Sequence, residues 1–178
     1  MNKWNSRLII HEFYIDNKPL VNRYELLLAA CPNAFIQQSI QWSMAIKDEG
    51  PDVPIFLLIE LDGEAIAGMP LYLFKGDWGN IITSIPQPGP IGGVFFKENF
   101  PGNEKINVYQ EIFNYIDSLA IKYDCILFST TTNPVEEDYN YYKTALNHDF
   151  ELKNFSQIIN LNEIQNRSHG VRNNINKS

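Results

Sequence analysis

One central stretch, VPIFLLIELDGEAIAGMPLYLFKG, constrains the fold of this chain more than any other part of the sequence. Two runs rich in apolar and β-branched residues, 53–61 and 64–74, flank the dipeptide Asp62-Gly63. An Asp-Gly pair between two such runs favours a short hairpin, because a type I′ turn needs positive φ angles at its centre. The sequence therefore predicts an antiparallel hairpin in the middle of the chain.

Further strands and helices are expected on both sides of this hairpin. Apolar periodicity and flanking turn residues place them, with Asn33 as an N-cap, Gly50 as a stop and Pro134 as the start of the last helix. The order gives a mixed α/β (α+β) fold, with a mostly antiparallel sheet flanked by helices. The expected strands are 7–15, 79–86, 91–96, a buried strand at 125–131, and 150–161, and the expected helices are 22–30, 33–50, 105–124 and 134–150.

Length and composition narrow the class of protein. A chain of 178 residues with 44% hydrophobic residues suits one domain with a real core. Its net charge of −7 argues against DNA as a partner, since phosphate neutralisation needs an excess of Lys and Arg. The sequence shows neither a signal peptide nor an apolar run near the ~18 residues of a membrane helix. With two scattered cysteines, interpreted as buried thiols, we expect a cytoplasmic protein without a membrane span.

The segment IPQPGPIGGV raises the question of phosphate binding, because glycine-rich loops often cradle phosphates. The prolines at 88 and 90 lack N–H donors, and the next expected helix does not follow the loop directly. The segment is therefore interpreted as a rigid connector between two strands, with one wall of an acceptor cleft as the functional alternative. The substrate-binding candidates in it are Gln87, Gly89, Gly92 and Gly93.

Other candidate sites each have a structural alternative. The hydroxyls of STTTNP, 129–134, line a cleft or cap the helix expected at Pro134. The acidic run 136–138 does acid–base work or complements a helix dipole. Tyr139 and Tyr142 stack on a ligand or pack on the sheet. His11, His148 and His169 lack metal-type spacing, so no metal is expected, and no catalytic residue can be assigned.

Five segments in order resemble a known family. They are FIQQSIQWSMAI, LLIELDGEAIAGMPLYLFK, SIPQPGPIGGVFF, FSQIINLN and RNNINKS. Together they resemble the GCN5-related N-acetyltransferase (GNAT) fold, and more closely the first of the two GNAT-like domains of the FemAB family of acyl- and aminoacyltransferases. The resemblance covers most of residues 33–178.

The resemblance implies a division of the chain and a function. Residues 1–164 would be a GNAT-like N-terminal domain, and 165–178 the start of a missing second domain or a disordered basic tail, with Arg172 as a substrate-binding candidate. The full protein would transfer an acyl or aminoacyl group to an amine on a peptidoglycan precursor or on a cell-surface or secondary-metabolite molecule.

The cosubstrate of that full protein would be acyl-CoA or an aminoacyl-tRNA, and its second GNAT-like domain would be a partner in the same chain. The fragment itself would bind no cofactor and would be inactive alone. Two alternatives remain open. One is a single-domain N-acetyltransferase that uses acetyl-CoA on a small-molecule acceptor, and the other is a non-catalytic binding domain.

Overall fold

The structure is a computed structural model that describes residues 7–47, 53–86, 89–135 and 138–153. The chain divides into two compact units, Met1–His148 and Asp149–Ser178. The fold described below is that of the first unit. In the second unit, residues 149–153 are exposed and form no strand, and the rest of the strand expected at 150–161 lies outside the described residues.

The central hairpin is present as predicted. Strand β2 (Val53–Leu61) pairs antiparallel with β3 (Glu64–Phe74). The turn residues Asp62 and Gly63 have φ angles of 52° and 86°. Both angles are positive, as a type I′ turn requires.

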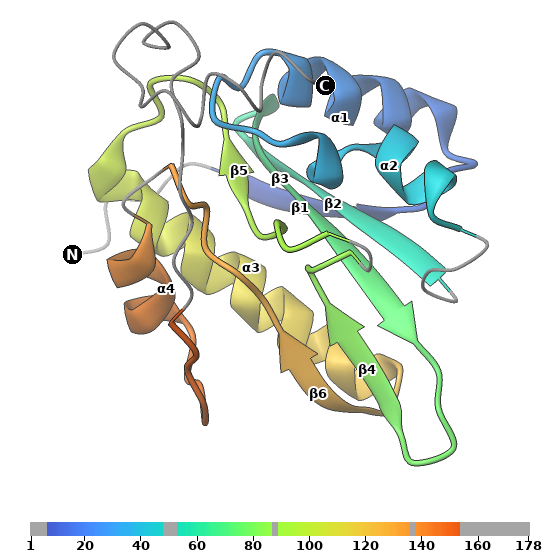
Figure 1. The fold of residues 1–178 in the computed structure, drawn as a ribbon. Helices are drawn as coiled ribbons and strands as arrows, with labels where there is room; N and C mark the ends of the chain where they lie inside the picture. The colour runs from blue at the N-terminus through green and yellow to red at the C-terminus, as the bar shows by residue number, and fades with distance from the viewer. Residues whose placement is uncertain (1–6, 48–52, 87–88, 136–137, 154–178) are drawn as a thin grey trace, which may run out of the picture. The chain divides into compact units, whose positions relative to one another are not determined.

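Other strands extend the sheet on both sides of the hairpin (Figure 1). Strand β1 (Leu8–Phe13) pairs antiparallel with β2, while β4 (Asn80–Thr83) and the short β5 (Phe95–Phe96) both pair antiparallel with β3. Strand β6 (Cys125–Ser129) runs parallel to β4. The order of the described sheet is β1-β2-β3-β4-β6, so the prediction of a mostly antiparallel sheet is confirmed.

Helices cover both faces of this sheet (Figure 1). Helix α1 (Lys18–Ala29), the short 3₁₀ helix η1 (Ile36–Gln38) and α2 (Ile40–Ala45) lie on one face. The 21-residue helix α3 (Gly102–Lys122) and α4 (Tyr139–Ala145) lie on the other. The Pro/Gly segment connects β4 to β5, as the sequence predicts.

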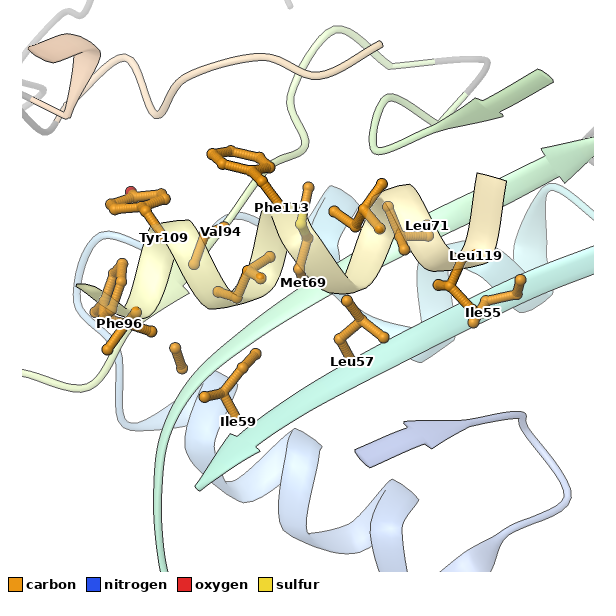
Figure 2. Close-up of a cluster of buried hydrophobic side chains, with 14 of the residues drawn as sticks. Ile55, Leu57, Ile59, Met69, Leu71, Val94, Phe96, Tyr109, Phe113 and Leu119 are labelled. Carbon is orange, nitrogen blue, oxygen red and sulfur yellow. The ribbon is translucent and has the colours of Figure 1, made fainter. Parts of the chain in front are cut away.

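Strand β2 supplies side chains to the core on both sides. Ile55, Leu57 and Ile59 pack under α3, as Figure 2 shows, while Phe56 and Leu58 pack under α1. A strand covered on both faces needs apolar residues at successive positions, which explains the unbroken run in the sequence. Each such side chain contributes roughly 1.5–3 kcal/mol when fully buried.

Several predicted boundaries are wrong for local reasons at the first two helices. Helix α1 begins four residues before the predicted 22, since the Asn17 side chain accepts from Leu20 N–H. The helix expected over 33–50 is broken, because Ser39 is extended and its hydroxyl caps α2 through Trp42 N–H. Asn33 is therefore not the N-cap.

The C-terminal elements also differ from prediction. The last helix begins at Tyr139 and not at Pro134, because the Asn133 side chain accepts from Val135 N–H and holds a turn there. Strand β6 is not buried, since it is an edge strand of the described sheet and leaves Ile126 67% exposed.

A carboxylate joins β1 to the C-terminal end of α3. Glu12 accepts hydrogen bonds from Tyr14 (2.7 Å), Tyr115 (3.1 Å) and Tyr123 (3.1 Å), and from Lys122 at 2.9 Å. Burial raises the pKa of Glu12, but the hydrogen bonds from Tyr14, Lys122 and Tyr123 outweigh it and hold this pKa below its ordinary value. The folded state therefore favours the ionised carboxylate.

The substitution Glu12→Gln tests this contact. We expect it to lower the free energy of unfolding at pH 7 by roughly 1.5–3 kcal/mol, the scale of hydrogen bonds to a charged group. Because the folded-state pKa is lowered, the stabilisation is complete above about pH 4.3 and is lost as the pH falls through the folded-state pKa. Urea unfolding at several pH values measures both effects. The exposed Glu64, paired with Lys97, is the control, and Glu64→Gln should change little.

Candidate functional site

The carboxyl ends of β4 and β6 meet at one place because these two strands run parallel. Ligands of α/β sheets bind most often at such ends. Here the hydroxyls bond to one another: Ser129 donates to Thr83 at 2.8 Å, and the Ser84 and Thr130 oxygens are 2.9 Å apart. These hydroxyls therefore tie the two strand ends together, and none of the four is a cap of α4.

The Pro/Gly loop packs directly on these strand ends. A Cβ added to Gly92 would lie 1.9 Å from the Ser84 carbonyl oxygen, and one added to Gly93 would lie 2.2 Å from the Thr131 carbonyl oxygen. Gly93 also has a φ of 81°. Glycine is needed at both positions because backbone passes against backbone.

The backbone of this loop is hydrogen-bonded to buried side chains. The Gln38 carboxamide donates to the Gly93 carbonyl at 3.1 Å and to the Gly92 carbonyl at 3.4 Å. Val94 N–H donates to the Tyr142 hydroxyl at 2.9 Å. Burial raises the pKa of Tyr142, so the phenol is neutral at physiological pH.

The predicted site residues have separate places. Gly92 and Gly93 lie together over the strand ends, and Gly89 lies beside the Gln37 side chain. Gln87 and Arg172 fall outside the described residues. Substrate binding by these five residues stays a prediction. Of the tyrosines expected on the sheet, Tyr142 is buried, whereas Tyr139 is 40% exposed.

A cleft of about 770 Å³ opens where the segment after β5 leads into α3. Its floor is aromatic, since Phe96 and Phe100 stack with ring centroids 5.3 Å apart. It has a polar rim from the 97–99 turn and from α4. The lining residues are Pro32, Asn33, Phe96, Lys97, Glu98, Asn99, Phe100, Gly102, Lys105, Asp138, Asn140 and Tyr141.

A buried ion pair lies in the wall of this cleft. Lys105 of the first turn of α3 approaches Asp138 at 3.4 Å, and Asp138 also accepts from the Tyr109 hydroxyl at 2.8 Å. The Lys105 ammonium lies 4.9 Å from the centroid of the Phe96 ring. The Asp138 carboxylate balances this ammonium, and the N–H groups at the start of α3 add partial positive charge at one end of the cleft, which suits an anionic group.

This cleft was not predicted from the sequence. Phosphate binding was considered for residues 85–94, whereas the turn that leads from a strand straight into the long helix is FKENFPG, 96–102. The signal was present as Pro101-Gly102 before a strongly amphipathic run. It was missed because the helix was expected to begin at 105, three residues after its actual start at Gly102.

No group of three metal-ligating side chains occurs among the residues that the structure describes. Within the same residues, no helix is long and apolar enough to cross a membrane.

Alanine at Gly92 or Gly93 tests the packing of the loop. We expect either substitution to lower the melting temperature strongly, on the order of a 2–4 kcal/mol loss, since a backbone oxygen occupies the space of the new Cβ. Differential scanning calorimetry measures the loss. Gly76→Ala is the matched control, because Gly76 has no positive φ and its nearest neighbour would be 3.3 Å away. Equal melting temperatures for all three variants would contradict the packing described.

Comparison with known proteins gives the fold a name. No protein-family model matches the sequence, and no curated protein matches it significantly. Solved structures do match. An aminoglycoside acetyltransferase from an uncultured soil metagenomic sample, in complex with sisomicin, superposes with a TM-score of 0.57 at 9% identity, over 86% of this chain and 96% of that one.

Two further structures agree. The ribosomal-protein-alanine N-acetyltransferase of Brucella melitensis gives a TM-score of 0.55 at 11% identity, over 85% and 99% of the two chains. The aminoglycoside N-acetyltransferase AAC(6')-Iy in complex with CoA gives 0.54 at 12%, over 89% and 99%. The described chain therefore has the mixed α/β fold of the GNAT acetyltransferases.

Proposed function

We propose that this chain is an N-acyltransferase that takes an acyl group from acyl-CoA and passes it to an amine. The observation that carries the proposal is the cleft at the start of α3, in a chain with the GNAT fold. CoA is bound by one of the proteins that it resembles. Phosphates of the cosubstrate would lie at the α3 N-terminus near Lys105, and the aromatic floor would take the apolar part.

The reaction needs positioning more than a reactive side chain. The amine nitrogen attacks the thioester carbonyl and loses a proton, the new C–N bond forms, the C–S bond breaks, and the thiol of CoA leaves. Catalysis would rest on holding the amine against the carbonyl and on N–H donors directed at the developing oxyanion. This proposal requires no metal.

The acceptor that we propose is a small cationic molecule with a primary amine. Two of the similar structures are aminoglycoside acetyltransferases, one of them in complex with sisomicin. The net charge of −7 would raise the local concentration of such a cation. Cytoplasmic location stays a prediction from the sequence.

A second candidate function follows from the packing of the strand ends. In the N-terminal half of a FemAB-type transferase, a second domain would bind the acyl-CoA or aminoacyl-tRNA. The hydrogen bonds of Gln38 and Tyr142 favour this candidate, because they close the strand ends with the chain's own atoms. In that case 1–164 would be the first domain, 165–178 would begin the second, and the acceptor would be a peptidoglycan precursor or a similar amine.

Calorimetry with acetyl-CoA separates the two candidates. Binding at micromolar concentration, with thiol release when an aminoglycoside is added, is expected for the single-domain enzyme. No binding to the folded chain would favour the FemAB-type half.

A charge substitution tests the cleft itself. Removal of Lys105 alone would leave Asp138 buried without its cation, so the comparison is made in an Asp138→Asn background. Adding Lys105→Met to that background should weaken acetyl-CoA binding about tenfold or more, the worth of a charged hydrogen bond to phosphate. The control is Lys143→Met, since Lys143 lies on α4 outside the cleft lining. Unchanged affinity of the double variant would exclude phosphate binding at Lys105.

A further inference from the structure

The outer edge of strand β5 is capped by side chains. Lys97 N–H donates to the Ile66 carbonyl of β3 at 2.8 Å. Because backbone groups alternate in direction along a strand, the N–H and C=O groups of Val94 and Phe96 point away from β3. On that outer side Val94 N–H donates to the Tyr142 hydroxyl, and the Phe96 carbonyl accepts from the Cys31 thiol. A free strand edge is a binding surface for an extended ligand with amide groups, and here the chain fills that surface itself.

Two side chains from opposite layers hold the residues that lead into β5. Gln38 of η1 holds the Gly92 and Gly93 carbonyls from one face, and Tyr142 of α4 holds Val94 from the other. We call Gln38 and Tyr142 the clamp. Gln38 is fully buried, and its own carbonyl accepts from the Tyr24 hydroxyl at 2.8 Å.

Tyr142 also links the loop over the strand ends to the side chains behind the cleft wall. Its ring centroid lies 4.9 Å from that of Tyr109, whose hydroxyl bonds to Asp138 in the cleft wall. On the other side, the Tyr142 hydroxyl lies 2.5 Å from the position of a Cβ on Gly93. Tyr142 therefore connects the side chains behind the cleft wall to the loop at Gly93 and Val94.

We propose that Tyr142 is a gating residue: it holds residues 92–94 closed over the ends of β4 and β6, and an acyl thioester reaches the β5 edge only when the clamp opens. This inference rests on the proposed acyltransferase function and adds to it an internal control of thioester entry. The nucleotide half of acyl-CoA binds in the cleft whether the clamp is closed or open. The amide-bearing arm and the thioester bind in the open state, where Val94 N–H is released to the ligand.

The expected effect of removing the clamp is tighter binding. Tyr142→Phe keeps the ring but removes the hydroxyl that accepts from Val94 N–H in the closed state. In the open state Val94 N–H bonds to water or ligand in either protein, so the variant destabilises the closed state alone. The open fraction rises, and the apparent affinity rises with it. Gln38→Met acts on the other half of the clamp and should shift affinity in the same direction.

The experiment compares two ligands by calorimetry and follows the Val94 amide by hydrogen exchange. In Tyr142→Phe, we expect acetyl-CoA to bind about five- to tenfold more tightly and the Val94 amide to exchange faster. Adenosine 3′,5′-bisphosphate, which has no arm, should bind the native protein and the variant equally. Tyr139→Phe is the control, since Tyr139 lies on the same helix and outside the cleft lining.

The outcomes are separable. The gate is overturned if acetyl-CoA binds with unchanged or weaker affinity to both Tyr142→Phe and Gln38→Met. The proposed function would still stand in that case if both ligands bind the native chain. If neither ligand binds any folded variant, the gate and the proposed function both fail. If Tyr142→Phe does not fold, the Gln38→Met result decides by the same criteria.

Discussion

Burial of β2 on both faces is the constraint on which the rest of the first unit depends. Ile55 and Phe56 point to opposite sides of the sheet and both are fully buried, so each face must carry its own helical layer. The sheet keeps the side chains of one helical layer from contacting those of the other. Their side chains can reach a common point only where the strands end, and the loop before β5 is such a point, because Gln38 and Tyr142 both bond to it.

The glycines of this loop allow close packing, and this packing determines which partners the backbone N–H and C=O groups of the loop can have. With no Cβ at 92 and 93, the loop packs closely against Ser84 and Thr131, and both glycines are buried. Buried N–H and C=O groups must then find partners in the protein, since an unpaired one costs on the order of 1–3 kcal/mol. The Gln38 carboxamide and the Tyr142 hydroxyl are those partners. A loop that binds phosphate needs the opposite arrangement, with N–H groups directed outward.

The sequence was sufficient to predict elements that depend on local turn residues or on a strong apolar periodicity. The Asp62-Gly63 turn, the two strands beside it and the buried face of α3 at Val108, Ile112 and Ile116 all follow from patterns within a few residues. Predictions failed where a distant contact decides. A strand was expected over 91–96, but only Phe95 and Phe96 form one, because only these two residues pair with β3, at Ala67 and Gly68.

The candidate site shows the same limit. Lys105, Asp138 and Tyr109 meet only after α3 and α4 pack, so an acidic run at 136–138 gave no sign that one member would be buried against a lysine. Gln38 was one of several polar residues in an expected helix, and nothing within its own segment links it to Gly93. The start of the cleft could have been found, because Pro101-Gly102 precedes the most amphipathic stretch of the chain.

The two candidate functions differ in one physical quantity, the free energy that separates the closed β5 edge from an open one. Neutral hydrogen bonds such as those of Gln38 and Tyr142 contribute about 1 kcal/mol each, net of their exchange with water. Burial of the Tyr142 ring against Tyr109 and Phe113 adds roughly 1.5–3 kcal/mol. These terms add to roughly 3.5–5 kcal/mol, which corresponds to an open conformation populated at ~0.02–0.3%, at the lower end of what a ligand can select. The closed edge is therefore compatible with a small enzyme that opens to its cosubstrate, and closure alone does not assign the chain to a transferase whose chemistry lies in another domain.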